Sequence, residues 1–147
     1  MLPEKLERSQ YGWLEADIVL PVWSDRPLRV FIFGEQQDTL TPEQERAFEY
    51  LVENQAAIKA TILALGPAYY EVLKERYAAQ GFIPELQSPE IERAMSLRCV
   101  HLEENSENGV ALTGYELDID WEEEHGMGVR MCLGEIRGVG DGAFNFD

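Results

Sequence analysis

The sequence predicts an α+β domain, in which a single antiparallel sheet of about five to seven strands carries two to three helices on one face. Apolar and polar residues alternate before residue 35 and again after residue 97, as they do in strands. Between residues 41 and 95 the apolar residues recur every three or four positions, as they do in helices. The expected order is therefore strands, helices, strands. A chain of 147 residues, 45% of them hydrophobic, has the size of one domain, so we expect residues 1–147 to share one core.

The first strands are expected between residues 11 and 35. Two runs rich in β-branched and aromatic residues, 18–23 and 28–33, are separated by Ser24-Asp25-Arg26-Pro27. Such a cluster is typical of a hairpin loop. We expect two or three antiparallel strands in this segment.

The helical segment begins at Thr41. Thr41 offers an N-cap hydroxyl, Pro42 occupies the first helical position, and Gln44 completes a capping box. The apolar stripe then continues until Gly66-Pro67, which ends the helix. A second helix is expected from Pro67 to a C-cap at Gly81, and a third from Ser88-Pro89-Glu90 to about residue 95.

The C-terminal third returns to a period of two. Strands are expected at 97–102, 110–121, 129–133 and 135–139, with a hairpin loop at 105–109. Along residues 115–121, alternation divides the side chains between the two faces of the sheet. One face receives Glu116, Asp118 and Asp120, and the other receives Leu117, Ile119 and Trp121.

Charge is the strongest global property of the chain. Its 28 acidic and 12 basic residues give a formal net charge of -16 and a pI near 4.4. This charge argues against nucleic acids and anionic membrane surfaces as partners and favours a basic protein or a cation. No apolar run could span a bilayer, the N-terminal segment lacks the apolar core of a signal peptide, and Cys99 and Cys132 form no CxxC pair. We therefore expect a soluble cytoplasmic protein.

The most unusual segment runs from Trp121 to Val129 and joins two predicted strands. It combines an indole, three carboxylates, an imidazole and two glycines. With Glu116, Asp118 and Asp120, its carboxylates could converge on Ca²⁺ or Mg²⁺, but no EF-hand spacing is present and a solvated acidic face is the favoured explanation. HExxH and nucleophile-elbow motifs are absent. The glycines at 126 and 128 are expected to form a positive-φ turn or a bulge.

Zinc ligation is a further alternative. Cys99, His101, His125 and Cys132 have suitable chemistry, and Cys99 and His101 share a predicted strand face with Leu97. Their spacing matches no standard zinc motif, and we expect Cys132 to be a small buried apolar residue. The sequence therefore assigns no catalytic, cofactor-binding or metal-binding residue.

Two motifs carry a resemblance to a known family. Residues 121–129 read W-E-E-E-H-G-M-G-V, with a glycine-rich turn at 138–141, and residues 40–44 read L-T-P-E-Q. In both motifs the chain resembles a family of small, uncharacterised bacterial proteins, whose C-terminal motif is W-[DE]-x-E-H-G-x-G-V. That family has no established catalytic role, and some relatives look like immunity proteins of bacterial toxin systems. The resemblance implies that Trp121, Glu122, Glu124 and His125 are the positions carried over, without an assigned chemistry.

These observations favour a non-enzymatic, acidic protein-binding module, with an immunity-type inhibitor of a basic toxin as its narrower form. The residues expected to bind the partner are Trp121, Glu122, Glu124, His125, Asp118 and Asp120. The second hypothesis is a small cation-dependent or hydrolytic enzyme that uses Asp118, Asp120, Glu124 and His125. The third is a structural domain in which the motif only fixes a turn.

Overall fold

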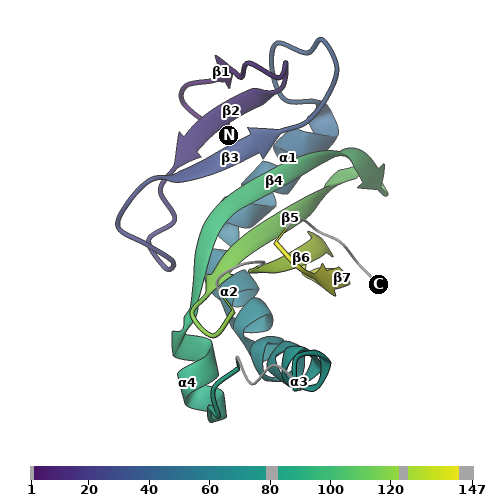
Figure 1. The fold of residues 1–147 in the computed structure, drawn as a ribbon. Coiled ribbons are helices and arrows are strands. Elements are labelled where there is room, and N and C mark those ends of the chain that lie inside the picture. The colour runs from purple at the N-terminus through teal and green to yellow at the C-terminus, as the bar shows by residue number, and fades with distance from the viewer. Residues whose placement is uncertain (1, 79–82, 123–125, 143–147) are drawn as a thin grey trace.

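The computed structural model describes residues 2–78, 83–122 and 126–142. In this part of the chain a seven-stranded sheet has its strands in sequence order from β1 to β7 (Figure 1). The strands are β1 (Glu7–Arg8), β2 (Leu14–Ile18), β3 (Leu28–Ile32), β4 (Met95–Glu107), β5 (Val110–Ile119), β6 (Met127–Cys132) and β7 (Glu135–Gly140). The α+β class, the single sheet and the order of strands, helices and strands are confirmed.

The helices follow β3 in the chain and are α1 (Pro42–Glu53), α2 (Gln55–Ala64), α3 (Gly66–Arg76) and α4 (Ser88–Arg93). The helix expected from Thr41 to Leu65 is divided at Asn54, whose φ of -120° and ψ of 23° are not helical. No glycine or proline marks this break, so the apolar periodicity gives no sign of it. Helix α3 ends at Arg76 with Tyr77 as its C-cap, before the predicted C-cap Gly81, which lies outside the described residues.

The start of α1 is fixed by the predicted capping box. The Thr41 Oγ1 atom accepts a hydrogen bond of 3.1 Å from the Gln44 backbone N–H, and Gln44 Oε1 accepts one of 3.0 Å from the Thr41 backbone N–H. Gln44 is only 1% exposed, and its side-chain amide also donates to the carbonyls of Phe33 and Glu103. One side chain therefore joins the helix start to both β3 and β4.

One strand pair of the sheet is parallel. β3 pairs with β4 in parallel, with Val30 opposite Val100 and Phe31 opposite His101, whereas the other neighbouring pairs are antiparallel. The prediction of an antiparallel sheet did not include this pair. Its cause is the helical segment between the two strands, because a long crossover can return the chain to the end of the sheet where β3 began.

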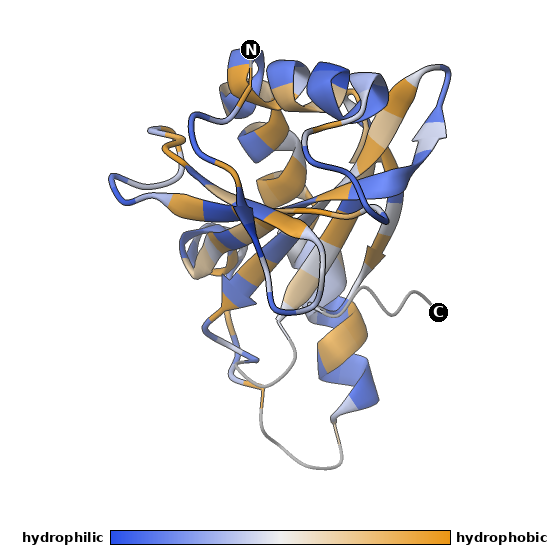
Figure 2. Cartoon of the chain, turned by 90° about the horizontal axis from the view of Figure 1, so that it is seen from above, coloured by the Kyte–Doolittle hydropathy of each residue, from blue (hydrophilic) through white to orange (hydrophobic). Residues whose placement is uncertain are grey.

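The core lies between the sheet and the helices. Helix α1 packs against β4 and β5 and passes behind them in Figure 1. The face of the sheet opposite α1 is called the outer face below. Hydrophobic and hydrophilic residues alternate along the strands (Figure 2), so that buried residues such as Val30, Val100 and Leu117 face the helices. None of the helices in the described ranges has the length and apolar character needed to cross a membrane.

A bulge in β4 changes which residues reach the outer face. The register with β5 shifts between Leu97, which pairs with Leu117, and Cys99, which pairs with Glu116. A bulge adds one residue to a strand and so breaks the alternation. Leu97 therefore joins the core at 6% exposure, while Cys99 and His101 lie on the outer face. The expectation that Leu97 shares their face is wrong for this reason.

Candidate functional site

The indole of Trp121 lies in the core, as the alternation along β5 predicts. It is 5% exposed and meets the Tyr70 ring edge to face, with 5.8 Å between the ring centroids. Its ring nitrogen is buried without a hydrogen-bond partner among the described residues. Trp121 therefore contributes to the packing between the sheet and α3.

Among the described residues, Asp118, Asp120 and Glu122 lie outside the core, whereas Trp121 lies inside it. The Asp118 carboxylate lies on the outer face, 2.7 Å from the guanidinium of Arg98. Asp120 is exposed at the end of β5, and Glu122 follows in a turn in which its N–H donates to the Ile119 carbonyl at 3.2 Å. The predicted binding residues Glu124 and His125, like residue 123, lie outside the described residues.

Gly126 has the positive φ that the sequence predicted, at 65°. A side chain at this position would place its Cβ 2.6 Å from the Leu117 carbonyl oxygen. The Tyr69 hydroxyl of α3 donates a hydrogen bond of 3.1 Å to the Gly126 carbonyl. Burial, followed by the charges of Asp141 and Glu122, raises the pKa of Tyr69 to about 12, so this donor stays protonated at neutral pH.

A cluster of three potential ligand atoms lies on the outer face, where β4 and β5 pair. Cys99 Sγ lies 3.0 Å from Glu116 Oε2 and 3.5 Å from His101 Nε2, and the latter two atoms are 3.2 Å apart. The bulge places Cys99 here, and the register sets Glu116 opposite it. Arg98, also exposed on this side, contacts the second oxygen of Glu116 at 3.4 Å.

The cluster is electrostatically coupled. Hydrogen bonding from His101, and then from Cys99, holds the pKa of Glu116 below its ordinary value. Burial, together with the hydrogen bond to Glu116, raises the pKa of the Cys99 thiol. At neutral pH the described contacts therefore join a thiol donor to a carboxylate acceptor.

The geometry of this cluster does not match a nucleophilic dyad. An activated cysteine needs a lowered pKa, whereas the pKa of Cys99 is raised. In a catalytic triad the acid contacts the nitrogen of histidine that is turned away from the nucleophile. Here Glu116 and Cys99 both contact Nε2 of His101.

A second feature of the outer face is a strip of aromatic rings at the end of the sheet nearest β1. It consists of Tyr11, Trp13 and Phe33 and is called the aromatic strip. Tyr11 is 70% exposed and stacks on Trp13 with 4.9 Å between centroids, and Trp13 meets Phe33 edge to face at 5.3 Å. A turn between β1 and β2 sets this arrangement, in which Gly12 has a φ of 94°. The strip reaches the cluster, because Phe33 also lies 5.4 Å from His101.

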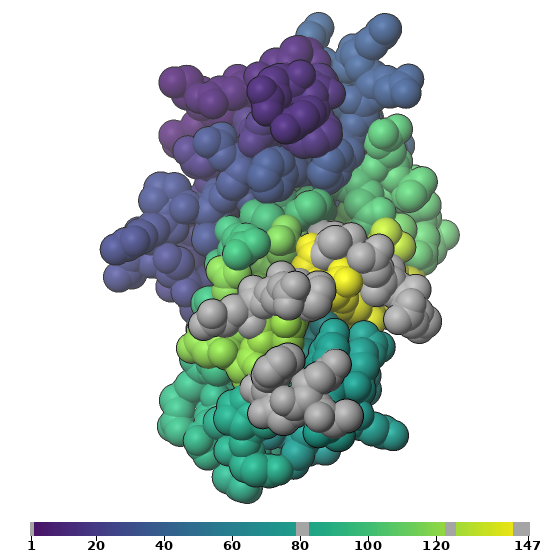
Figure 3. Space-filling model, in the orientation of Figure 1, coloured from purple at the N-terminus to yellow at the C-terminus, as the bar shows by residue number. Residues whose placement is uncertain are grey.

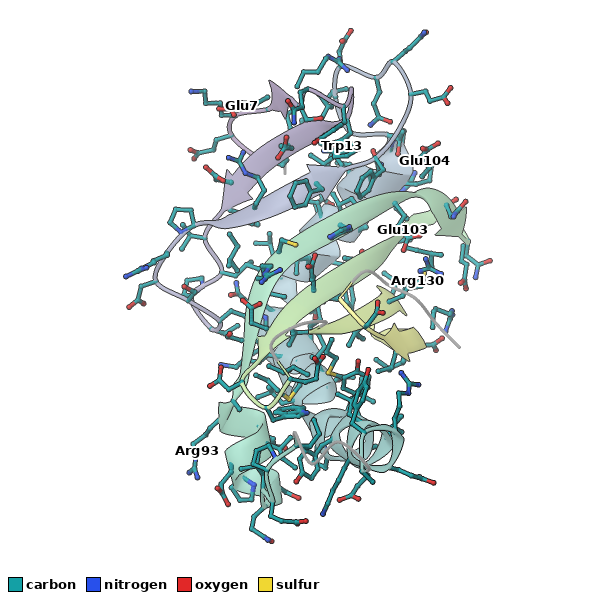
Figure 4. All side chains as sticks on the ribbon, in the orientation of Figure 1. Glu7, Trp13, Arg93, Glu103, Glu104 and Arg130 are labelled. Carbon is teal, nitrogen blue, oxygen red and sulfur yellow. The ribbon has the colours of Figure 1, made fainter. Side chains whose placement is uncertain are left out.

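Carboxylates border the aromatic strip. A hollow of about 460 Å³ is lined by the strip, by Arg8, which pairs with Asp38 at 2.9 Å, and by two exposed residues, Glu35 and Glu104, called the acid rim. Neither rim side chain has an ion pair or a hydrogen bond with any residue in the described ranges. Figure 4 shows Trp13 and Glu104 near the same end of the sheet, away from Arg93 on α4.

A neighbouring hollow of about 450 Å³ continues along β4 from the acid rim. Its lining comprises Phe33, His101, Glu103, Glu104, Asn105 and Arg130. The Glu103 carboxylate is held at 2.8 Å by the Arg130 guanidinium from β6, and both are labelled in Figure 4. The two hollows share Phe33 and Glu104, so they form one continuous surface. In Figure 3 the N-terminal strands that carry the strip lie at the opposite end of the molecule from α3 and α4.

The sequence interpretation missed Glu116 as a neighbour of Cys99, and it missed the aromatic strip. Alternation did place Glu116 on a solvent face, and Cys99 and His101 on a shared face. The missing information was the pairing register between β4 and β5. Cys132, considered with Cys99 for zinc, is buried on β6, where its Sγ lies 4.0 Å from the Glu107 carbonyl.

Comparison with known proteins gives one match. A family model, described as "Domain of unknown function (DUF6985)", matches residues 3–145. No curated protein and no solved structure matches the chain. Because the family model spans nearly the whole sequence, the chain belongs to the family of proteins with the DUF6985 domain of unknown function.

Proposed function

We propose that this protein is a non-enzymatic, acidic binding module that recognises a basic segment of another protein. The observation that carries the proposal is the exposed ring of Tyr11, stacked on Trp13 beside the acid rim, whose carboxylates have no ion pair within the described part of the chain. Exposed aromatic side chains supply binding energy because they lose apolar surface to the partner at small entropic cost. Carboxylates without partners supply charge complementarity to Lys and Arg.

The recognition would use two interactions on the same side chain of the partner. A guanidinium or ammonium group of the partner lies over the face of Tyr11 or Phe33 and pairs with Glu35 or Glu104. The net charge of -16 attracts such a segment from a distance and speeds association. The binding residues proposed here differ from the predicted ones, because Trp121 is buried and Asp118 is paired with Arg98.

The narrower form of this function is an immunity-type inhibitor of a basic toxin. It is favoured by the resemblance of residues 121–129 to a family in which some relatives look like immunity proteins. We place the activity in the cytoplasm, where free cysteines such as Cys99 and Cys132 stay reduced. Co-expression with the product of the adjacent gene tests the inhibitor form. Rescue of growth supports it, whereas persistent toxicity or a harmless product contradicts it.

The binding function is tested with a short Arg/Gly/Ser peptide, labelled for fluorescence anisotropy, and a matched peptide with Glu at each Arg position. The double variant Glu35→Gln/Glu104→Gln is compared with Glu71→Gln/Glu75→Gln, which removes the same charge from exposed positions on α3. The acid-rim variant is expected to raise the Kd about tenfold, because two charge pairs of roughly 0.5 to 1 kcal/mol each are lost.

The control variant on α3 is expected to change the Kd by less than about twofold, since it only reduces the long-range attraction. Equal weakening by both variants would mean that the peptide responds to net charge alone. Equal binding of the Glu peptide, or no binding of the Arg peptide to the wild type, contradicts the proposed function.

A further inference from the structure

Three side chains of different chemistry converge on one point of the outer face. They are Cys99 and His101 on β4 and Glu116 on β5, and their ligand atoms lie within 4.8 Å of one another. We propose that they form a binding site for a divalent metal ion of the zinc type. This inference does not depend on the proposed binding function.

The spacing of the three atoms fits one small ion. A tetrahedral zinc ion with Zn–S of about 2.3 Å and Zn–N or Zn–O of about 2.1 Å has ligand-to-ligand edges of about 3.4 to 3.6 Å. The Sγ to Nε2 distance is 3.5 Å and the Nε2 to Oε2 distance is 3.2 Å. The Sγ to Oε2 distance of 3.0 Å is shorter, and a small rotation of the Glu116 side chain lengthens it.

The surrounding residues hold the ligands in place before any ion binds. The His101 ring is packed between Phe31 and Phe33, with 5.4 Å from its centroid to each. The Arg98 guanidinium contacts Glu116 at 3.4 Å and Asp118 at 2.7 Å. Contacts of this kind orient metal ligands and raise the affinity of their sites.

The donor set selects the metal. Ca²⁺ and Mg²⁺ require oxygen ligands, whereas a thiolate, an imidazole and a carboxylate together suit Zn²⁺. Binding exchanges one proton for the ion: the Cys99 S–H bond breaks, the proton passes to solvent, and the thiolate coordinates the metal. The two negative ligands then balance the charge of the ion. The charge of Arg98 is already balanced by Asp118.

Three protein ligands leave the fourth tetrahedral position for a ligand from outside the cluster. Zinc sites with three protein ligands take a water molecule or an external group at that position. His101 also lines the hollow that contains Glu103 and Asn105, so the cluster borders a concave surface. The site is therefore of the kind that exchanges its fourth ligand.

The test uses the full chain, stripped with a chelator and titrated with Co²⁺, whose absorption reports thiolate ligation and coordination number. The wild type is expected to bind one equivalent with a thiolate-to-cobalt charge-transfer band and strong d–d bands, which Zn²⁺ abolishes. Cys99→Ala is expected to lose the charge-transfer band. The matched variant Cys132→Ala is expected to keep it, because Cys132 lies away from the cluster on β6.

Glu116→Gln is the second test variant in case Cys99→Ala does not fold, because it preserves the shape of the side chain and removes only its negative charge. It is expected to weaken Co²⁺ binding by at least about tenfold. The proposal is overturned if the wild type binds no Co²⁺, if Cys99→Ala retains the charge-transfer band, or if Cys132→Ala abolishes it. Unchanged Co²⁺ affinity in folded Glu116→Gln would overturn it as well.

Discussion

The side-chain amide of Gln44 donates a hydrogen bond of 2.7 Å to the backbone carbonyl of Phe33. This contact joins the first turn of α1 to the residue that follows β3 and that contributes a ring to the aromatic strip. The same amide lies 3.2 Å from the Glu103 carbonyl on β4. A single buried amide thus connects the capping box, the parallel strand pair and the proposed binding surface.

Gln44→Leu keeps the side-chain volume and removes these hydrogen bonds. We expect it to lower the free energy of unfolding by about 2 to 4 kcal/mol, because buried carbonyls and the Thr41 N–H lose their partner. Urea unfolding measures the loss. Gln10→Leu is the control, since Gln10 is exposed, and it is expected to change stability by less than about 0.5 kcal/mol. A similar small change in both variants would mean that the Gln44 network contributes little.

Trp121→Ala is expected to cost about 3 to 5 kcal/mol of stability, the usual range for deletion of a buried large aromatic side chain. Its indole is 5% exposed and contacts Tyr70, so the deletion leaves a cavity beside α3. Thermal and urea unfolding provide the measurement. Tyr11→Ala, at a ring that is 70% exposed, is expected to cost far less while weakening peptide binding. The reverse pattern would make Trp121 a contact residue.

Comparing Gly126→Ala with Gly12→Ala separates the strain of a positive φ from the strain of a steric clash. Both Gly126 and Gly12 have a positive φ, but a Cβ at Gly126 meets the Leu117 carbonyl oxygen at 2.6 Å, whereas a Cβ at Gly12 meets nothing within 4 Å. Gly12→Ala is expected to cost about 1 kcal/mol from its backbone conformation alone. Gly126→Ala is expected to cost at least twice as much in urea unfolding. Equal costs would show that the turn relaxes around the added methyl group.

The Cys99 thiol is expected to react slowly with iodoacetamide at pH 8, because burial and then Glu116 raise its pKa. A raised pKa favours the protonated form of the folded protein. The contribution of this raised pKa to the free energy of unfolding is present below the ordinary thiol pKa of about 8.5. It is lost as the pH rises above that value, because the unfolded chain then ionises first. Glu116→Gln, made in a Cys132→Ala background, is expected to shift the pH profile of alkylation to lower pH. An unchanged profile would contradict a role for the carboxylate.

Local signals in the sequence predicted the elements of the fold. Thr41, Pro42 and Gln44 gave the start of α1, and alternation placed Trp121 inside and Asp118 outside. The division at Asn54 could not be predicted, because the residue lacks the restriction of proline and the freedom of glycine. The parallel pairing of β3 with β4 could not be predicted either, since it joins residues such as Phe31 and His101 across the whole helical segment.

The candidate site depends on the same non-local information. Cys99 and Glu116 become neighbours only when the register between β4 and β5 is known, and the bulge after Leu97 decides which face Cys99 occupies. The aromatic strip depends on the turn at Gly12, which brings Tyr11 over Trp13. Composition favours a basic partner for the proposed function, but it could not locate the proposed binding surface.

The most direct test of the proposed binding surface is ¹⁵N chemical-shift mapping of the wild-type protein with the Arg/Gly/Ser peptide. We expect the largest shifts at Tyr11, Glu35 and Glu104 and at the indole N–H of Trp13, with half-saturation at a free peptide concentration equal to the Kd measured by anisotropy. Shifts centred on Trp121 and Glu122, or spread evenly over the exposed carboxylates, would contradict recognition of a basic segment by the aromatic strip and the acid rim.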